Sequence, residues 1–263
     1  MDAFEDIRKE VERTQVIIPA GGKAKRMGAI DKPKALLELG NKTLLDLCIE
    51  LCESNGFKEF VFLLGYRHKE IEEHLKKKNY FERVRVRVSI EPETVSGKGM
   101  ALRYALENNK IERGKRALML FPDDIILDRK FPLRFLLQHL HNIESNGVVA
   151  TVALVSGSQY PYGVAEVNAS GIITNFQEKP FIERYTNTGL VFMEPEVFKY
   201  IERLIPLESE KAIEFEEIVL PALAKEKKVA AMIVQPGIWI PVNTYKEYEK
   251  AEGILKEKGI IRE

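Results

Sequence analysis

Two spacings of apolar residues alternate along the first half of the chain. Short continuous apolar runs such as QVIIPA and EFVFLLG are typical of buried strands, while apolar residues spaced three or four positions apart indicate helices. We expect strands at 15–20, 59–65, 83–90 and 116–121, and helices at 43–54, 68–78 and 99–109. Either Asn41 or Thr43 caps the first of these helices. Strands and helices in alternation predict an α/β fold with right-handed βαβ units and a mostly parallel sheet.

The second half of the chain is less regular, because its short strand segments cluster. Strands are expected at 147–155, 163–167, 172–176, 190–192 and 228–235, and helices at 131–145, 195–204, 212–225 and 245–255. No internal repeat or low-complexity linker interrupts the pattern. We therefore interpret residues 15–263 as a single domain. Residues 1–14 form a charged helical extension whose Phe4, Ile7 and Val11 share one face, which favours docking onto the body over a partner site.

Composition and charge exclude several classes of protein. The 263 residues include 40 Lys plus Arg against 40 Asp plus Glu, and this balance argues against the strongly basic face that nucleic-acid binding needs. No apolar stretch is long enough for a membrane span and no targeting signal precedes the first strand, so we expect a cytoplasmic protein. Abundant Glu and Lys with scarce Gln fit a thermophile. Cys48 and Cys52, the only cysteines, are expected to pack in the core, because no further cysteine completes a metal site.

The segment IIPAGGKAKRMGAIDKPK carries the most chemical information. The small residues Ala20, Gly21, Gly22 and Ala24 follow a strand and allow close approach of a ligand to the backbone. The cations of this segment are Lys23, Lys25, Arg26 and Lys34. Backbone N–H groups and cations together suit a triphosphate, although the segment matches neither a P-loop nor the dinucleotide fingerprint. A flexible basic surface loop is the alternative.

Two further strand ends carry candidate residues. Gly97 and Gly99 in SGKGMAL open a helix, either as a second close-approach turn in the same crevice or as an ordinary helix start. Asp123 and Asp124 directly follow a buried strand, where carboxylates can hold Mg²⁺ against phosphates. Because side chains alternate along an extended chain, we expect Asp124 to point away from Asp123 and prefer Asp123 as the ligand.

The motifs also occur together and in order. AGGKAKRM with KPK, FPDDI, YGVAEV, the EKP triplet and NTGLVF follow one another along residues 15 to 251. In this set the chain resembles the sugar-1-phosphate nucleotidylyltransferases. IIPAGG and FPDDII are similar to the glucose-1-phosphate uridylyltransferase and thymidylyltransferase branch, and GGKAKRMG also to the molybdopterin-cofactor nucleotidyltransferases. The resemblance implies a Rossmann-like, three-layer α/β/α fold with a mixed sheet.

The resemblance also implies roles for single residues. Arg26 matches the catalytic arginine, Lys34 the lysine of KPK, and Asp123 the Mg²⁺ ligand. Nucleotide binding is implied for Ala20, Gly21, Gly22, Lys23, Ala24, Lys25, Glu91 and Gly97. Sugar-phosphate binding is implied for Tyr162, Gly163, Glu178, Lys179 and Asn187, which from the residues alone are only polar groups beside short strands. Lys179 is expected to grip the phosphate and to act in catalysis.

The chain departs from the family pattern at two places. Ala24 and Lys25 replace a glycine and a threonine of the usual phosphate loop. Pro241 stands where the family has the aspartate that is its second metal ligand, and Asn243 offers a neutral oxygen instead. The loss of a carboxylate keeps open a catalytically reduced, nucleotide-sugar-binding regulatory subunit.

The implied reaction joins an NTP and a sugar 1-phosphate to give an NDP-sugar and pyrophosphate, with Mg²⁺ as cofactor. The motifs favour UTP or dTTP with glucose 1-phosphate. The carboxylate of Glu91 can accept from N3–H of uracil or thymine, or from the paired donors of guanine, so the base stays open. A homo-oligomer also stays open, since nothing in the sequence decides the oligomeric state.

Overall fold

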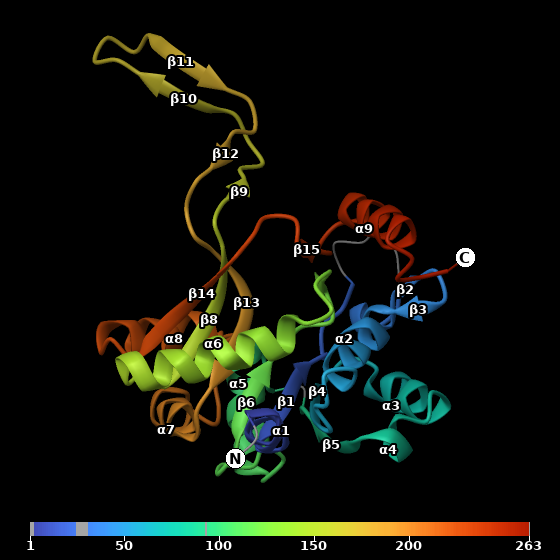
Figure 1. Ribbon diagram of the computed structural model, residues 1–263. Helices are drawn as coiled ribbons and strands as arrows, with labels where there is room; N and C mark the ends of the chain where they lie inside the picture. The colour runs from blue at the N-terminus through green and yellow to red at the C-terminus, as the bar shows by residue number, and fades with distance from the viewer. Residues whose placement is uncertain (1–2, 25–30, 93, 263) are drawn as a thin grey trace.

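A seven-stranded mixed sheet forms the centre of the computed structural model, which describes residues 3–24, 31–92 and 94–262 (Figure 1). In spatial order its strands are β14 (Val229–Val234), β8 (Ala150–Val155), β13 (Thr186–Met193), β6 (Arg116–Met119), β1 (Thr14–Pro19), β4 (Glu59–Leu64) and β5 (Arg85–Ile90). Strand β13 runs antiparallel to both neighbours, and every other pair is parallel. The predicted mixed, mostly parallel sheet is confirmed.

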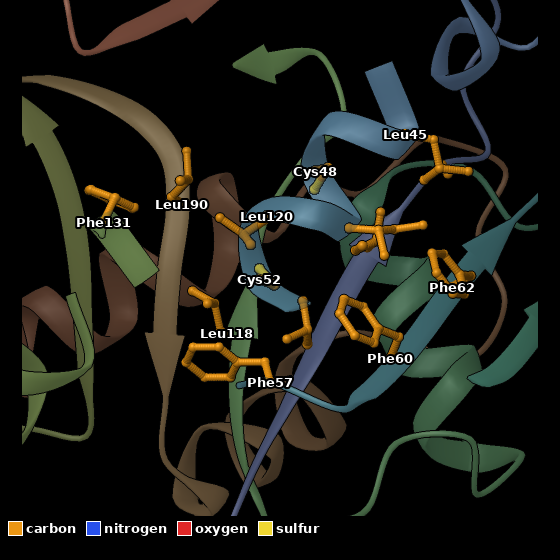
Figure 2. Close-up of a cluster of buried hydrophobic side chains, with 14 of the residues drawn as sticks. Leu45, Cys48, Cys52, Phe57, Phe60, Phe62, Leu118, Leu120, Phe131 and Leu190 are labelled. Atoms are coloured by element: carbon orange, nitrogen blue, oxygen red, sulfur yellow. The ribbon is translucent and has the colours of Figure 1, made fainter. Parts of the chain in front are cut away.

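Helices cover both faces of the sheet, because alternate residues of each strand point to opposite sides. One face packs against α2 (Leu44–Glu53), α3 (His68–Lys77) and α6 (Phe131–Asn146). The other packs against α5 (Lys98–Glu107), α7 (Pro195–Leu204) and α8 (Phe215–Lys225). Figure 2 shows Cys48 and Cys52 of α2 among the apolar side chains of the first face, and both thiols are buried as predicted. The three-layer α/β/α prediction is confirmed.

Local contacts explain where α2 begins and how the N-terminal helix docks. Thr43 caps α2, since its hydroxyl accepts from the backbone N–H of Asp46 while the Asp46 carboxylate accepts from the N–H of Thr43. The N-terminal helix α1 (Ala3–Glu12) docks onto the body through Val11, which is buried, and Ile7, which packs on the same core. The side chain of Phe4 lies outside the described residues.

A third, smaller cluster lies beside the carboxyl ends of the central strands. Helix α9 (Tyr245–Glu257) and the paired strands β15 (Trp239–Pro241) and β7 (Asp124–Ile126) pack against the β2 (Glu38–Leu39) and β3 (Lys42–Thr43) hairpin. The short 3₁₀ helix η1 (Lys34–Leu36) precedes that hairpin, and α4 (Tyr80–Arg83) precedes β5. Helix α9 was predicted at 245–255, whereas β2, β3, β7, β15, η1 and α4 were not. They bring the C-terminal segment next to the Asp123–Asp124 turn.

The strands predicted at 163–167 and 172–176 do form, but outside the central sheet. Strands β10 (Val164–Val167) and β11 (Ile173–Gln177) pair with each other, and β9 (Ser158–Gln159) pairs with β12 (Phe181–Ile182) below them. Together residues 156–185 form a hairpin arm that extends away from the body (Figure 1). Among the helices of the described ranges, none combines the length and apolarity that a membrane crossing requires.

Candidate active site

A cavity of about 340 Å³ opens at the carboxyl ends of β1 and β6, and we call it the strand-end cavity. Its lining includes seven residues that the sequence singled out: Ala20, Gly21, Gly22, Lys34, Glu91, Gly97 and Asp123. They come from five separate segments of the chain. Parallel strands end at one edge of a sheet, so segments distant in sequence meet there.

The first loop approaches its neighbours closely enough to require glycine. A Cβ on Gly21 would lie 2.9 Å from the backbone nitrogen of Gly65 and 3.3 Å from a carboxylate oxygen of Glu91. The ends of the loop are tied together, since the N–H of Lys34 donates to the carbonyl of Gly22 at 3.1 Å. The loop between these ends contains Lys25 and Arg26, which lie outside the described residues.

Two residues of this loop, Lys23 and Ala24, are not among the lining of the cavity. Ala24 is 2% exposed and packs in the third core cluster, so its side chain faces the interior instead of the cavity. Lys23 is exposed, and its ammonium lies 4.4 Å from the centre of the Tyr66 ring. Neither side chain lines the strand-end cavity.

Glu91 follows β5 and faces the glycine loop. Burial raises the pKa of its carboxyl group to about 7, because a charged form is poorly solvated there. The carboxyl therefore suits a ligand that donates hydrogen bonds to it.

The ammonium of Lys34 contacts two side chains whose oxygens the sequence assigned to a metal ion. It contacts the carboxylate of Asp123 and donates to the amide oxygen of Asn243 at 3.1 Å. The three side chains come from η1, from the turn after β6 and from the residue before the α9 cap. The charged contact also places a cation on the wall of the strand-end cavity.

Asp124 lies next to this contact and is partly buried. The indole N–H of Trp239 donates to its carboxylate at 2.8 Å. Burial, with the nearby charge of Asp123, raises the pKa of Asp124 to about 7. The prediction that Asp124 points away from Asp123 is wrong in one respect: both line a second cavity, because the chain turns here, with the N–H of Asp124 donating to the carbonyl of Phe121 at 3.1 Å.

This second cavity, of about 520 Å³, adjoins the first through Lys98, Phe121, Asp123 and Glu214, and we call it the acidic cavity. Its remaining lining residues are Asp124, Asn187, Thr188, Gly189, Glu216, Glu217, Trp239 and Asn243. Asn187 is the one residue of the predicted sugar site found here. Sequence analysis missed the glutamates, since they start a helix in a segment without a motif.

The oxygen donors fit a magnesium ion that also binds substrate. Within residues 3–24, 31–92 and 94–262, no three His, Cys, Asp or Glu side chains gather as a metal cluster by themselves. Mg²⁺ instead uses one or two carboxylates, waters and substrate phosphates. Asp123, Asp124 and Asn243 supply such a partial set. Pro241 has no oxygen in its side chain and pairs with Asp124 across the β15–β7 ladder.

Position 97 requires glycine because of its own backbone conformation and the backbone that lies against it. Its φ is +87°, and a Cβ would lie 2.4 Å from the carbonyl oxygen of Ile213. The N–H of Gly99 donates to the same carbonyl at 2.9 Å. The turn thus lines the strand-end cavity and fixes the segment that carries Glu214.

The other predicted sugar residues lie together, but on the hairpin arm. A Cβ on Gly163 would lie 2.6 Å from the Phe176 ring and 3.0 Å from a carboxylate oxygen of Glu178. The ammonium of Lys179 lies 3.9 Å from the other oxygen of Glu178, and Tyr162 is 68% exposed. Neither cavity, as the described residues line it, includes Tyr162, Gly163, Glu178 or Lys179.

Several curated proteins are similar to this chain in sequence. A mannose-1-phosphate guanylyltransferase catalytic subunit beta from Drosophila pseudoobscura is 27% identical over 89% of this chain and 60% of its own length. A mannose-1-phosphate guanyltransferase from Schizosaccharomyces pombe is 25% identical over 89% of this chain and 62% of its own. The chain thus spans about three fifths of the length of these curated relatives.

Solved structures share the fold. A putative glucose-1-phosphate thymidylyltransferase from Bacillus anthracis superposes with a TM-score of 0.70 at 20% identity, covering 93% of this chain and 96% of that one. HddC from Yersinia pseudotuberculosis, complexed with GMP-PN, gives 0.65 at 20% identity, covering 92% and 99%. A family model described as nucleotidyl transferase matches residues 15–258. The resemblance seen in the motifs is confirmed, and the chain belongs to the nucleotidyl transferase family.

Proposed function

We propose that this protein transfers a nucleotidyl group from an NTP to a sugar 1-phosphate, releasing pyrophosphate and an NDP-sugar. The observation that carries the proposal is the meeting of the glycine loop, Lys34 and Asp123 in one strand-end cavity. Small residues give the phosphates access to backbone N–H groups, while the ammonium and the carboxylate supply the charges that phosphoryl transfer needs.

In this reaction a phosphate oxygen of the sugar 1-phosphate bonds to the α-phosphorus of the NTP. The bond from that phosphorus to the bridging oxygen of the pyrophosphate breaks, and its electrons leave with pyrophosphate. The protein contributes position and charge, with no covalent intermediate. Lys34 offsets negative charge on the phosphates, and Arg26 is assigned the same task from its place in the motif alone.

Mg²⁺ is part of the proposal. Asp123, Asp124 and the amide oxygen of Asn243 are the groups of this chain that would hold it. When bound, the ion neutralises charge on the phosphates. Because Lys34 contacts two of the same oxygens, its ammonium would compete with a metal ion held by Asp123 and Asn243.

We further propose GTP as the nucleotide and mannose 1-phosphate as the acceptor, in place of the UTP or dTTP and glucose 1-phosphate that the motifs favoured. The similar curated proteins are mannose-1-phosphate guanylyltransferases by name. Guanine offers two adjacent donors, N1–H and the 2-amino group, which can satisfy both oxygens of the buried Glu91 carboxylate. Uracil and thymine offer it a single donor.

A nucleotide-sugar-binding regulatory subunit is the second candidate, and Pro241 is the observation that favours it. The residue opposite Asp124 in the β15–β7 ladder contributes no metal ligand. Such a subunit would bind the NDP-sugar without Mg²⁺-dependent turnover.

Pyrophosphate release tests both candidates. GTP, UTP, dTTP, CTP and ATP are each combined with mannose, glucose, galactose and N-acetylglucosamine 1-phosphate, with and without Mg²⁺. Turnover of GTP with mannose 1-phosphate, abolished by chelation, is the expected result. Turnover of UTP or dTTP with glucose 1-phosphate would reverse the base and sugar proposal. No turnover, together with calorimetric binding of an NDP-sugar, would favour the regulatory subunit.

A further inference from the structure

Four residues line both the strand-end cavity and the acidic cavity, and we call them the junction residues: Lys98, Phe121, Asp123 and Glu214. The proposed reaction puts the NTP in the strand-end cavity, against the glycine loop and Lys34. It puts the sugar 1-phosphate in the acidic cavity, whose lining includes Asn187. The oxygen that attacks and the phosphorus that it attacks then meet beside the junction residues.

The acceptor side of this junction carries an excess of negative charge. Five carboxylates line the acidic cavity, those of Asp123, Asp124, Glu214, Glu216 and Glu217. Among the lining residues that the structure describes, Lys98 is the one cation. A sugar 1-phosphate is itself an anion, so its phosphate depends on positive charge to enter this cavity. Besides a metal ion, the ammonium of Lys98 is the group of the described lining that meets this need.

Contacts from two other elements hold this ammonium at the junction. Its nitrogen lies 2.6 Å from the carboxylate of Glu216 and 3.8 Å from that of Glu214, both at the start of α8. It also lies 4.9 Å from the centre of the Phe121 ring, which follows β6. The backbone N–H of Lys98 donates to the Glu214 carboxylate at 3.2 Å. The cation is therefore positioned before a ligand arrives, which lowers the cost of ordering it on binding.

The ammonium of Lys98 keeps hydrogen-bonding capacity for a ligand. A lysine ammonium has three N–H donors, and the contact with Glu216 uses one of them. The separation of 3.8 Å from Glu214 is too long for a hydrogen bond. The Lys98 side chain is 37% exposed and lines both cavities. It can therefore stay paired with Glu216 and donate to a phosphate oxygen at the same time.

We propose that Lys98 is a further catalytic residue, which binds the phosphate of the sugar 1-phosphate at the junction of the two cavities. This inference rests on the proposed function. As the phosphate oxygen bonds to the α-phosphorus and pyrophosphate leaves, Lys98 keeps its proton, and its charge offsets the repulsion between the two phosphates. Glu216 and Glu214 are positioning residues for the ammonium. Lys34 lines the strand-end cavity alone, so the two lysines serve different substrates.

Steady-state kinetics test this division between the substrates. Lys98→Met keeps a long side chain and removes the charge. It is expected to raise the KM for mannose 1-phosphate by roughly 10- to 100-fold, as the loss of one hydrogen bond between charged groups does, and to leave the KM for GTP nearly unchanged. An unchanged KM for the sugar phosphate, or an equal rise for both substrates, would overturn the proposal.

Lys228→Met is the matched control, because Lys228 has similar surroundings outside both cavities. It pairs with Glu196 at 2.6 Å, its ammonium lies 5.5 Å from the centre of the Tyr200 ring, and its side chain is 35% exposed. Both KM values should stay at the wild-type level in this variant. A rise in the KM for mannose 1-phosphate equal to that of Lys98→Met would show that the effect does not depend on the junction.

A second variant separates phosphate binding from a purely structural role. A structural Lys98 would serve only to neutralise Glu216, whose other carboxylate oxygen is buried without a hydrogen-bond partner among the described residues. Lys98→Met combined with Glu216→Gln removes both charges, so no buried carboxylate is left unpaired. The double variant is expected to keep the high KM for mannose 1-phosphate. A return to the wild-type KM would assign Lys98 to the neutralisation of Glu216 and overturn the proposal.

Binding without turnover separates failure of this inference from failure of the proposed function. Trp239, the single tryptophan, lines the acidic cavity, so its fluorescence reports titration with mannose 1-phosphate or mannose. The titrations are made with Mg²⁺, in the presence and absence of α,β-methylene GTP, which cannot release pyrophosphate. Wild type is expected to bind mannose 1-phosphate more tightly than mannose, and Lys98→Met to lose most of this difference.

The outcomes of the titration are distinct. Equal affinity of wild type and Lys98→Met for mannose 1-phosphate would overturn the role of Lys98 and leave the proposed function standing. If wild type binds none of the four sugar 1-phosphates of the turnover panel, the proposed function fails, and the inference about Lys98 fails with it.

Discussion

The ammonium of Lys34 contacts the carboxylate of Asp123, and this ion pair joins the loop after β1 to the turn after β6. Its side chains are only 18% and 29% exposed. The pair connects the proposed phosphate and metal sites, because Lys34 also donates to Asn243. The proposed function therefore gives Lys34 two opposed effects: attraction of phosphate and competition with a metal ion.

The first effect predicts a loss of activity. Lys34→Ala is expected to lower kcat by roughly 10²-fold, the usual cost of removing one group that stabilises developing charge. Steady-state pyrophosphate release measures it. Lys42→Ala is the matched control, since Lys42 pairs with Glu50 at 2.8 Å and lies outside both site cavities. Equal kinetics for Lys34→Ala and wild type would remove Lys34 from the mechanism.

The second effect predicts tighter metal binding in the same variant. Without the ammonium, Asp123 and Asn243 are free to bind a cation, so Lys34→Ala should bind Mg²⁺ several-fold more tightly than wild type in the absence of nucleotide. Trp239 is the single tryptophan and donates to Asp124, which makes its fluorescence a direct reporter. Unchanged or weaker affinity would contradict competition between Lys34 and the metal.

The sequence predicted the strand-end cavity well, because parallel strands bring their carboxyl ends to one edge. Gly21, Lys34, Glu91 and Asp123 meet there although they follow different strands. The sequence did not predict the residues whose positions depend on contacts between short segments far apart in the chain. The β7–β15 pairing, which holds Asp124 against Trp239, consists of three residues a side and has no periodicity to detect.

The hairpin arm shows a second limit of prediction from sequence. Two short strands were predicted near 163–167 and 172–176, and both form. Their residues alone do not say in which direction the pair extends from the sheet. Sequence therefore identified Lys179 as a sugar-phosphate residue by resemblance, while its distance from the cavity lining depends on the direction of the ribbon.

Glu91 should make stability depend on pH. Its pKa in the folded state is raised from 4.5 to about 7, so the folded state holds a proton that the unfolded state has lost between these values. Stability from this group is complete below pH 4.5 and declines as pH rises to 7, by about 3 kcal/mol at most. Glu91→Gln removes that decline. Urea unfolding from pH 4 to 8 measures it, and parallel curves for the two proteins would contradict the raised pKa.

The same substitution tests base selection. Glutamine presents one acceptor and one donor, so its donor opposes the N1–H and 2-amino pair of guanine. Glu91→Gln should lower kcat/KM for GTP by roughly 10²-fold, since a buried polar group is left without its partner. The values for the pyrimidine nucleotides should change less. An equal loss for every nucleotide would indicate a structural role for Glu91 instead of base recognition.

Gly97 should be essential for stability on backbone grounds alone. Its φ of +87° and ψ of 152° lie in a region that only glycine adopts readily, and an added Cβ would meet the Ile213 backbone, which cannot move aside like a flexible side chain. Gly97→Ala is expected to lower the free energy of unfolding by about 1–3 kcal/mol from the dihedral strain, with the steric clash adding to it. Gly114→Ala is the control, because its Cβ would enter open space. Equal unfolding midpoints for the two variants would show that the Gly97–Ile213 contact yields without cost, and the positions of Gly99 and Glu214 would then need another anchor.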